Sequence, residues 1–83
     1  MYVYIKCENM TKYVIIDSSA NRTILSYLGW DYEEGAGVLV FTPPEKPFKV
    51  LLSEVASALI ELGYAREVEA LSIARTFFMN EAR

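Results

Sequence analysis

The sequence contains no histidine and one cysteine, and these absences narrow the chemistry open to it. Histidine is the usual general base and the commonest metal ligand, so its absence disfavours hydrolytic triads and histidine-held metals. The lone Cys7 excludes an internal disulfide and a thiolate metal cage. Its place beside Val3 and Ile5 in an alternating run indicates a buried apolar residue. We therefore expect no enzyme activity, no cofactor and no bound metal.

Long apolar runs are also missing. No stretch of about 18 uninterrupted apolar residues occurs, which excludes a membrane-spanning helix. Lys6 and Glu8 interrupt the N-terminal residues, where a signal peptide needs a continuous apolar run. We expect a protein that acts in the cytoplasm and does not bind membranes.

Basic residues are few and scattered. Eight Lys and Arg residues stand against eleven Asp and Glu residues, for a net charge of −3. Proteins that bind nucleic acids usually present clustered basic residues to the phosphates. Binding to duplex nucleic acid is therefore disfavoured, and a protein partner with a basic surface fits this chain better.

Apolar residues, by contrast, are abundant for so short a chain. The 83 residues suffice for one domain, 1–83, of which 53% are hydrophobic, with a mean hydropathy of +0.18. A domain of this size hides only about 60% of the surface of its unfolded chain. The surplus is expected to face a second copy of the chain, another protein or a ligand.

Three segments have the pattern of β-strands. Residues 2–8 alternate between two faces, with Val3, Ile5 and Cys7 on one of them, and residues 12–17 are more nearly apolar on both faces. A short turn at residues 9 and 10 would join them into a β-hairpin. Residues 37–41 predict a short buried third strand.

The remaining apolar patterns predict helices. Residues 20–28 carry apolar side chains at helical spacing, and Gly29 followed by Trp30 is typical of a Schellman helix end. A strand within residues 20–32 stays open as the alternative, because Ile24, Leu28, Trp30 and Tyr32 are all even-numbered and would lie on one face of a strand. Two C-terminal helices are predicted, one from Phe48 to Leu62 and one over residues 65–80.

The predicted element order is ββαβαα. It describes an α+β domain in which a small, mainly antiparallel sheet, made of the N-terminal hairpin and a third strand, packs with two C-terminal helices. The last helix has a wider apolar face than one contact with a sheet requires. We therefore predict a homodimer in which Ile73, Phe77 and Phe78 mediate self-association.

Residues 31–37 predict an acidic loop that combines aromatic and acidic side chains. Interfaces favour Trp and Tyr, and carboxylates beside them would attract a basic partner. The predicted partner-binding residues are Trp30, Asp31, Tyr32, Glu33 and Glu34. The structural alternative is that Trp30 folds back on the preceding helix, with Tyr32 packed beneath the loop.

The leading functional hypothesis is a non-enzymatic protein-interaction module that acts as an inhibitor, adaptor or accessory subunit. Small acidic chains of this kind are often accessory proteins of phages, viruses or mobile elements. One alternative is binding of single-stranded nucleic acid by Tyr2, Tyr4 and Tyr13 on one face of the sheet. The other is a metal or small-molecule site at the acidic residues 31–34.

Overall fold

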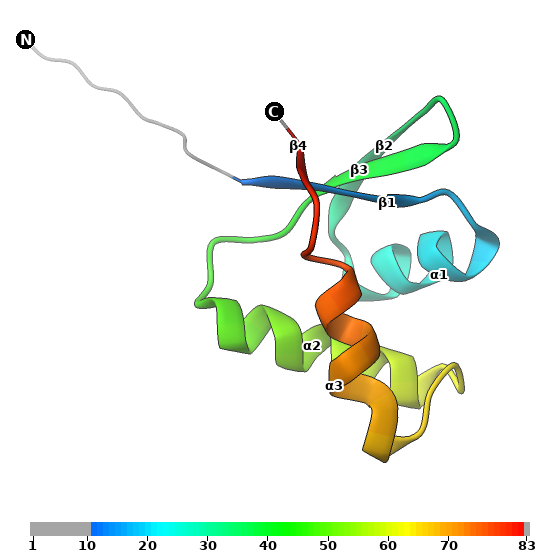
Figure 1. Ribbon diagram of the computed structural model, residues 1–83, viewed down its shortest axis with the longest axis vertical. Coiled ribbons are helices and arrows are strands. Elements are labelled where there is room, and N and C mark those ends of the chain that lie inside the picture. Colours follow the sequence, from blue (N-terminus) through cyan, green and yellow to red (C-terminus); the bar gives the residue numbers. More distant parts are fainter. Residues whose placement is uncertain (1–10, 83) are drawn as a thin grey trace, which may run out of the picture.

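The computed structural model describes residues 11–82, which form an antiparallel sheet and three helices (Figure 1). The elements are β1 (Lys12–Ile16), α1 (Ser19–Leu28), β2 (Asp31–Gly35), β3 (Val38–Thr42), α2 (Phe48–Glu61), α3 (Glu67–Thr76) and β4 (Glu81–Ala82). The strands lie in the order β2-β3-β1-β4. The predicted α+β class, the antiparallel sheet and the pair of C-terminal helices are confirmed.

All three helices lie on one side of the sheet, so the fold has two layers (Figure 1). Alternation along the strands turns Ile15, Leu39 and Phe41 toward the helices, where they are buried. Each helix contributes an apolar stripe to the same core. The largest fully buried side chains of this core are Ile24, Leu25, Leu39, Phe41 and Val55. The opposite side of the sheet, which we call the outer face, receives no helix from the described residues.

Helix α1 begins and ends on the signals that the sequence contains. The Asn21 N–H donates to the Ser18 hydroxyl at 3.1 Å, which caps the N-terminus. At the other end Gly29 takes a φ of 75°, and the Trp30 N–H donates to the Leu25 carbonyl at 3.1 Å. These bonds form the predicted Schellman end. Residues 20–28 are therefore helical, and the strand alternative holds only for Asp31 and Tyr32, where β2 begins.

The acidic residues form a strand and not the predicted loop. β2 pairs with β3 from Asp31 to Gly35, and only Ala36 and Gly37 remain to connect the two strands. Both connecting residues have positive φ values, 51° and 81°, as the tightest hairpin turns require. Charged side chains are tolerated in β2 because it is an edge strand, where they also discourage pairing with other chains.

The C-terminal helix α3 is shorter than predicted. It ends at Thr76 and not at Asn80, because the residues beyond it join the sheet. The Asn80 carbonyl accepts a 2.8 Å hydrogen bond from the Val14 N–H, and β4 pairs with Lys12 and Tyr13. A two-residue strand is too short to leave a pattern in the sequence.

The predicted N-terminal strand 2–8, with its hairpin turn, lies outside the described residues. On the edge of β1 that faces away from β3, the described partner of Lys12 and Tyr13 is β4. Beyond β4, no described strand lies beside Ile15 and Ile16 on that edge. This open edge adjoins an apolar hollow.

Candidate functional site

Trp30 belongs to the core and not to an exposed interface. Only 7% of its surface is accessible, and its ring stacks on Phe41 with centroids 6.0 Å apart and an interplanar angle of 18°. Phe78 lies on it at 6.3 Å. The Schellman turn directs Trp30 back over the sheet, which agrees with the structural alternative for this residue.

The other predicted partner-binding residues are divided between the two sides of β2. Tyr32 and Glu34 point toward the helices, whereas Asp31 and Glu33 point to the outer face and are exposed. The three carboxylates therefore do not converge on one metal or small-molecule site. Within residues 11–82, no three acidic or cysteine side chains gather as metal ligands would.

Glu34 is engaged within the chain by Arg22 of α1. The guanidinium donates to both carboxylate oxygens of Asp17 at 2.7 Å, and its Nη1 donates to Glu34 Oε2 at 2.7 Å. The hydrogen bonds from Arg22 hold the pKa of Asp17 below its ordinary value, and the same contacts raise the pKa of Arg22. This cluster fastens the end of β1 and the start of α1 to the edge strand.

The outer face carries an apolar centre. Val14 lies opposite Val40, and Ile16 lies opposite Val38, in the β1–β3 ladder. These four β-branched side chains share one face because they alternate with the buried residues of both strands. Ile16 is 71% exposed, so this apolar centre reaches the surface at the open edge of β1.

Charged residues border this apolar centre along β2 and along the end of the sheet where β1 begins. Asp31 pairs with Thr42, and Glu33 pairs with Val40, which places an acidic row along β2. Lys12 of β1 lies in the same row as Asp31 and Thr42, because its neighbour Tyr13 pairs with Phe41. The outer face is thus acidic along β2 and basic at the start of β1, with Thr42 between Asp31 and Lys12 and the apolar pairs in the neighbouring rows.

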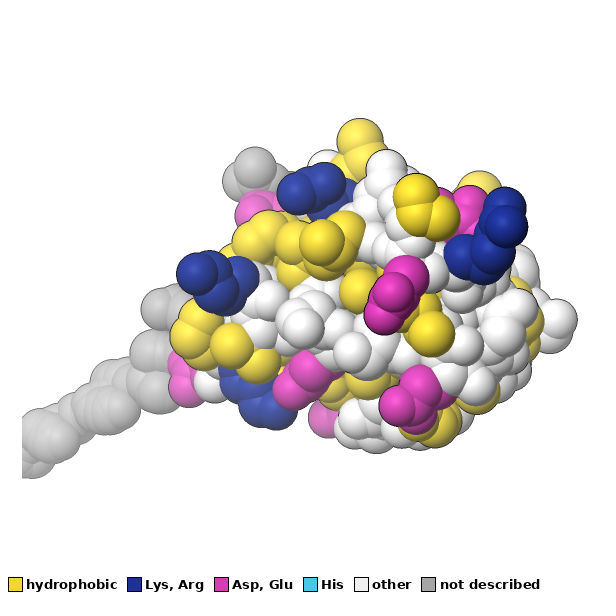
Figure 2. Space-filling model, turned by 90° about the horizontal axis from the view of Figure 1, so that it is seen from below, with side chains coloured by type: hydrophobic (Ala, Val, Ile, Leu, Met, Phe, Trp, Pro, Cys, Tyr) yellow, Lys and Arg dark blue, Asp and Glu magenta, His cyan; other side chains and the backbone are white. Residues whose placement is uncertain are grey.

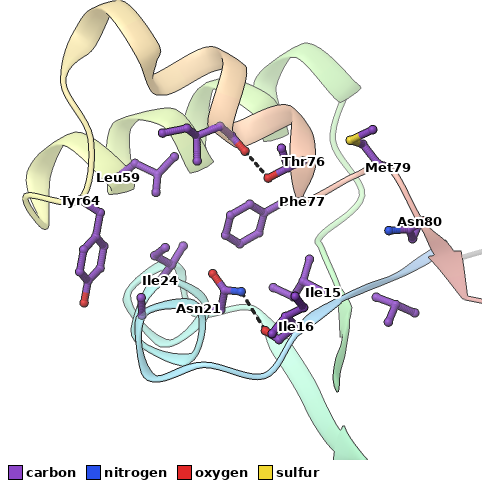
Figure 3. A pocket seen from close by; sticks show the side chains of 13 residues that line it. Ile15, Ile16, Asn21, Ile24, Leu59, Tyr64, Thr76, Phe77, Met79 and Asn80 are labelled. Atoms are coloured by element: carbon purple, nitrogen blue, oxygen red, sulfur yellow. Dashed lines mark hydrogen bonds between the residues drawn. The ribbon is translucent and has the colours of Figure 1, made fainter. Parts of the chain in front are cut away.

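The hollow beside the open edge of β1 is an apolar groove of about 540 Å³ (Figure 3). The core residues Ile15, Ile24, Leu59 and Phe77 form its buried part. Its other lining residues are Val14, Ile16, Ala20, Asn21, Tyr64, Ile73, Thr76, Met79 and Asn80. The groove therefore brings together residues from β1 and all three helices with the segment after α3.

Two polar side chains of the groove lining are hydrogen-bonded within the chain. The Asn21 amide donates to the Ile16 carbonyl at 2.8 Å, and the Thr76 hydroxyl donates to the Ile73 carbonyl at 2.6 Å (Figure 3). None of the described residues that line the groove is charged. Such a surface favours a neutral, apolar occupant, because a charged group would lose its hydration there without gaining a partner.

The predicted self-association residues do not form one exposed stripe. Phe77 is 3% exposed and packs on Phe41 at 6.2 Å, so it is a core residue of the single chain. Ile73 is half-buried and lines the groove, and the half-buried Phe78 packs edge-on against Phe48 at 5.3 Å. The sequence pattern predicts one long helix, but the chain leaves helical geometry after Thr76 and turns these rings inward.

Of the three tyrosines proposed to stack on nucleic-acid bases, Tyr13 is the one that the structure describes, and it does not lie on the open face of the sheet. Tyr13 points to the helical side, where its ring lies 5.7 Å from Phe41 and 5.1 Å from Phe78. Tyr2 and Tyr4 lie outside the described residues.

Surplus apolar surface is nevertheless present. Seen from the side of the helices, Figure 2 shows apolar side chains at the surface among scattered charged ones. The exposed large apolar residues include Tyr27, Phe48, Val50, Ile60, Tyr64, Val68, Leu71 and Met79. Six of them are spread over the three helices, whereas Tyr64 and Met79 line the groove.

None of the described helices combines the length and apolar character needed to cross a membrane. Comparison with models of protein families, with curated proteins and with solved structures finds no match for this chain. A function therefore has to be inferred from the arrangement of the chain's own residues.

Proposed function

We propose that this chain is a small, non-enzymatic, cytoplasmic protein-interaction module that associates with a second copy of itself. We further propose that it binds an uncharged, apolar, extended segment of another protein in the groove beside β1. The observation that carries the proposal is the groove of about 540 Å³, with an apolar lining in which no described residue is charged. The proposal applies alike to an inhibitor, an adaptor and an accessory subunit.

The size and composition of the groove support this proposal. Binding sites commonly occupy about 300–1,000 Å³ and combine an apolar lining with a few polar groups. Here the buried part is aliphatic and aromatic, and Met79 at the rim is 71% exposed. Flexible, exposed methionine is common on surfaces that receive apolar side chains from partners.

The open strand edge explains why the proposed segment is extended. β4 pairs only with Lys12 and Tyr13, and the next bond on that edge joins the Val14 N–H to the Asn80 carbonyl. By the alternation of an antiparallel ladder, the Ile16 N–H points to the same side as that of Val14, toward the groove. An extended segment beside Ile16 would accept this hydrogen bond while its apolar side chains enter the groove.

Selection from a library of random peptides tests this proposal. Peptides are selected on the wild-type chain, and their affinities are measured for Ile73→Glu and for Leu71→Glu. Ile73 lines the groove, whereas Leu71 is exposed on the same helix and does not line it, so Leu71→Glu is the matched control.

We expect the selected peptides to be uncharged and apolar and to bind the wild type and Leu71→Glu alike. They should bind Ile73→Glu at least about tenfold more weakly, because one unpaired charge would then be buried in the groove. Circular dichroism of both variants checks that they are folded. Peptides that bind all three proteins equally, or no enrichment at all, would contradict the proposal.

A further inference from the structure

We infer that a second copy of this chain covers the outer face of the sheet. The two sheets pack face to face about a twofold axis parallel to the strands, so that Lys12 of each copy lies on the side of Asp31 and Glu33 of the other. This inference specifies the self-association in the proposed function and rests on it.

The apolar centre of the outer face is the first reason. Val14, Ile16, Val38 and Val40 form two cross-strand pairs on a face that no described residue covers. Sheets with one apolar outer face commonly bury it against a second layer about 10 Å away. The three helices already cover the other face, so this second layer has to come from outside residues 11–82 (Figure 1).

The arrangement of charge identifies the partner as a second copy. The face is acidic along β2 and basic at Lys12 of β1; Thr42 lies between Asp31 and Lys12, and the apolar pairs occupy the neighbouring rows of β1 and β3. A surface that carries acidic residues on one strand and a basic residue two strands away is complementary to itself when one copy is turned over about an axis parallel to the strands. A twofold interface needs this self-complementarity, because the same patch is used on both sides.

Charge also selects the direction of the twofold axis. An axis parallel to the strands, between β3 and β1, places β3 of one copy over β1 of the other and carries the acidic β2 to the side of Lys12. An axis perpendicular to the strands would place β2 over β2 and set Glu33 against Glu33. Like charges at such short distance repel each other, so the parallel axis is favoured.

The size of the face predicts a reversible dimer. With neighbouring strands about 4.8 Å apart and residues rising about 3.3 Å, a sheet of four short strands offers only about 300 Å² of projected area per copy. Stable interfaces usually bury about 800 Å² of accessible surface per partner. We therefore expect an equilibrium between monomer and dimer that depends on protein concentration and weakens as salt screens the charges.

Two complementary charge variants test the inference. Lys12→Glu makes the flanks of the outer face entirely acidic, and Asp31→Lys combined with Glu33→Lys makes them entirely basic. Glu67→Lys, on the exposed surface of α3, is the control for a change in net charge alone. Molar mass is measured by size-exclusion chromatography with light scattering across a concentration series, for each variant and for an equimolar mixture of the two.

The wild type and Glu67→Lys are expected to dimerise at high concentration. Each face variant alone is expected to dimerise at least about tenfold more weakly, and the mixture is expected to recover dimers, because opposite charges then face each other. If the wild type dimerises but neither face variant alters its mass, the inferred surface is wrong while self-association stands. If the wild type stays monomeric throughout, both are wrong, and the groove is still judged by its own peptide experiment.

Discussion

Replacing Trp30 by alanine distinguishes a core residue from an interface residue. Trp30 is 7% exposed and lies between Phe41, at 6.0 Å, and Phe78, at 6.3 Å. A buried aromatic side chain removes about 150–250 Å² from water, worth about 4–6 kcal/mol at about 25 cal/mol per Å². Alanine retains part of this burial, so Trp30→Ala is expected to lower the free energy of unfolding by about 3–5 kcal/mol.

That loss is large for a chain of this length. At about 0.05–0.15 kcal/mol per residue, the whole domain is stabilised by only about 4–12 kcal/mol. With a urea dependence of about 1 kcal/mol per molar, the unfolding midpoint should fall by about 3 M or more. If the wild type itself unfolds at low urea concentration, Trp30→Ala should already be unfolded without urea.

Urea unfolding followed by far-UV circular dichroism measures the effect, since the signal does not depend on the substituted tryptophan. Tyr64→Ala is the matched control, because it truncates an aromatic side chain that is 45% exposed. The control is expected to shift the midpoint by less than about 1 M, in line with a surface substitution. A shift equally small for Trp30→Ala would refute the assignment of Trp30 to the core and restore it as a candidate for partner binding.

Two further predictions concern the edge of the sheet. Ala36→Asn should raise the free energy of unfolding by about 0.5–1 kcal/mol in the same urea experiment, because asparagine adopts the φ of 51° found at this position more readily than alanine. An unchanged or lower urea midpoint would contradict this prediction. Asp17→Asn should lower the melting temperature slightly at neutral pH, because the pairing of Asp17 with Arg22 stabilises the fold only while the carboxylate is charged. The pKa of Asp17 is lowered in the fold, so the difference in melting temperature from wild type should be lost as the pH falls below about 4. A difference that persists at low pH would show that Asp17 acts through something other than its charge.

The sequence is most informative where short-range signals determine the structure. The caps of α1, the glycine after it and the apolar stripe of α2 depend on residues a few positions apart, so local reasoning locates these helices. The charge of residues 31–37 favours a loop and conceals the hairpin that the chain forms there. The alternation of Trp30, Tyr32 and Glu34 with Asp31 and Glu33 is the signal that indicates a strand.

Long-range pairing accounts for the remaining differences. β4 exists because Glu81 and Ala82 meet β1, a contact between residues far apart in the chain that no local pattern encodes. The same contact ends α3 early and turns Phe77 into the core. The groove could not be predicted from the sequence for a related reason, since its lining comes from separate elements and none of them is unusual alone.

The pairing of β4 with β1 also has a consequence for how the domain can be connected to other chains. Lys12 and Ala82 are direct partners in the ladder, so the two ends of the described domain lie on neighbouring strands about 5 Å apart. Both ends can therefore be joined by a short linker, and new ends can be opened at the exposed turn of Ala36 and Gly37. For the same reason the whole domain can be inserted into a surface loop of another protein with little separation of that loop's two ends.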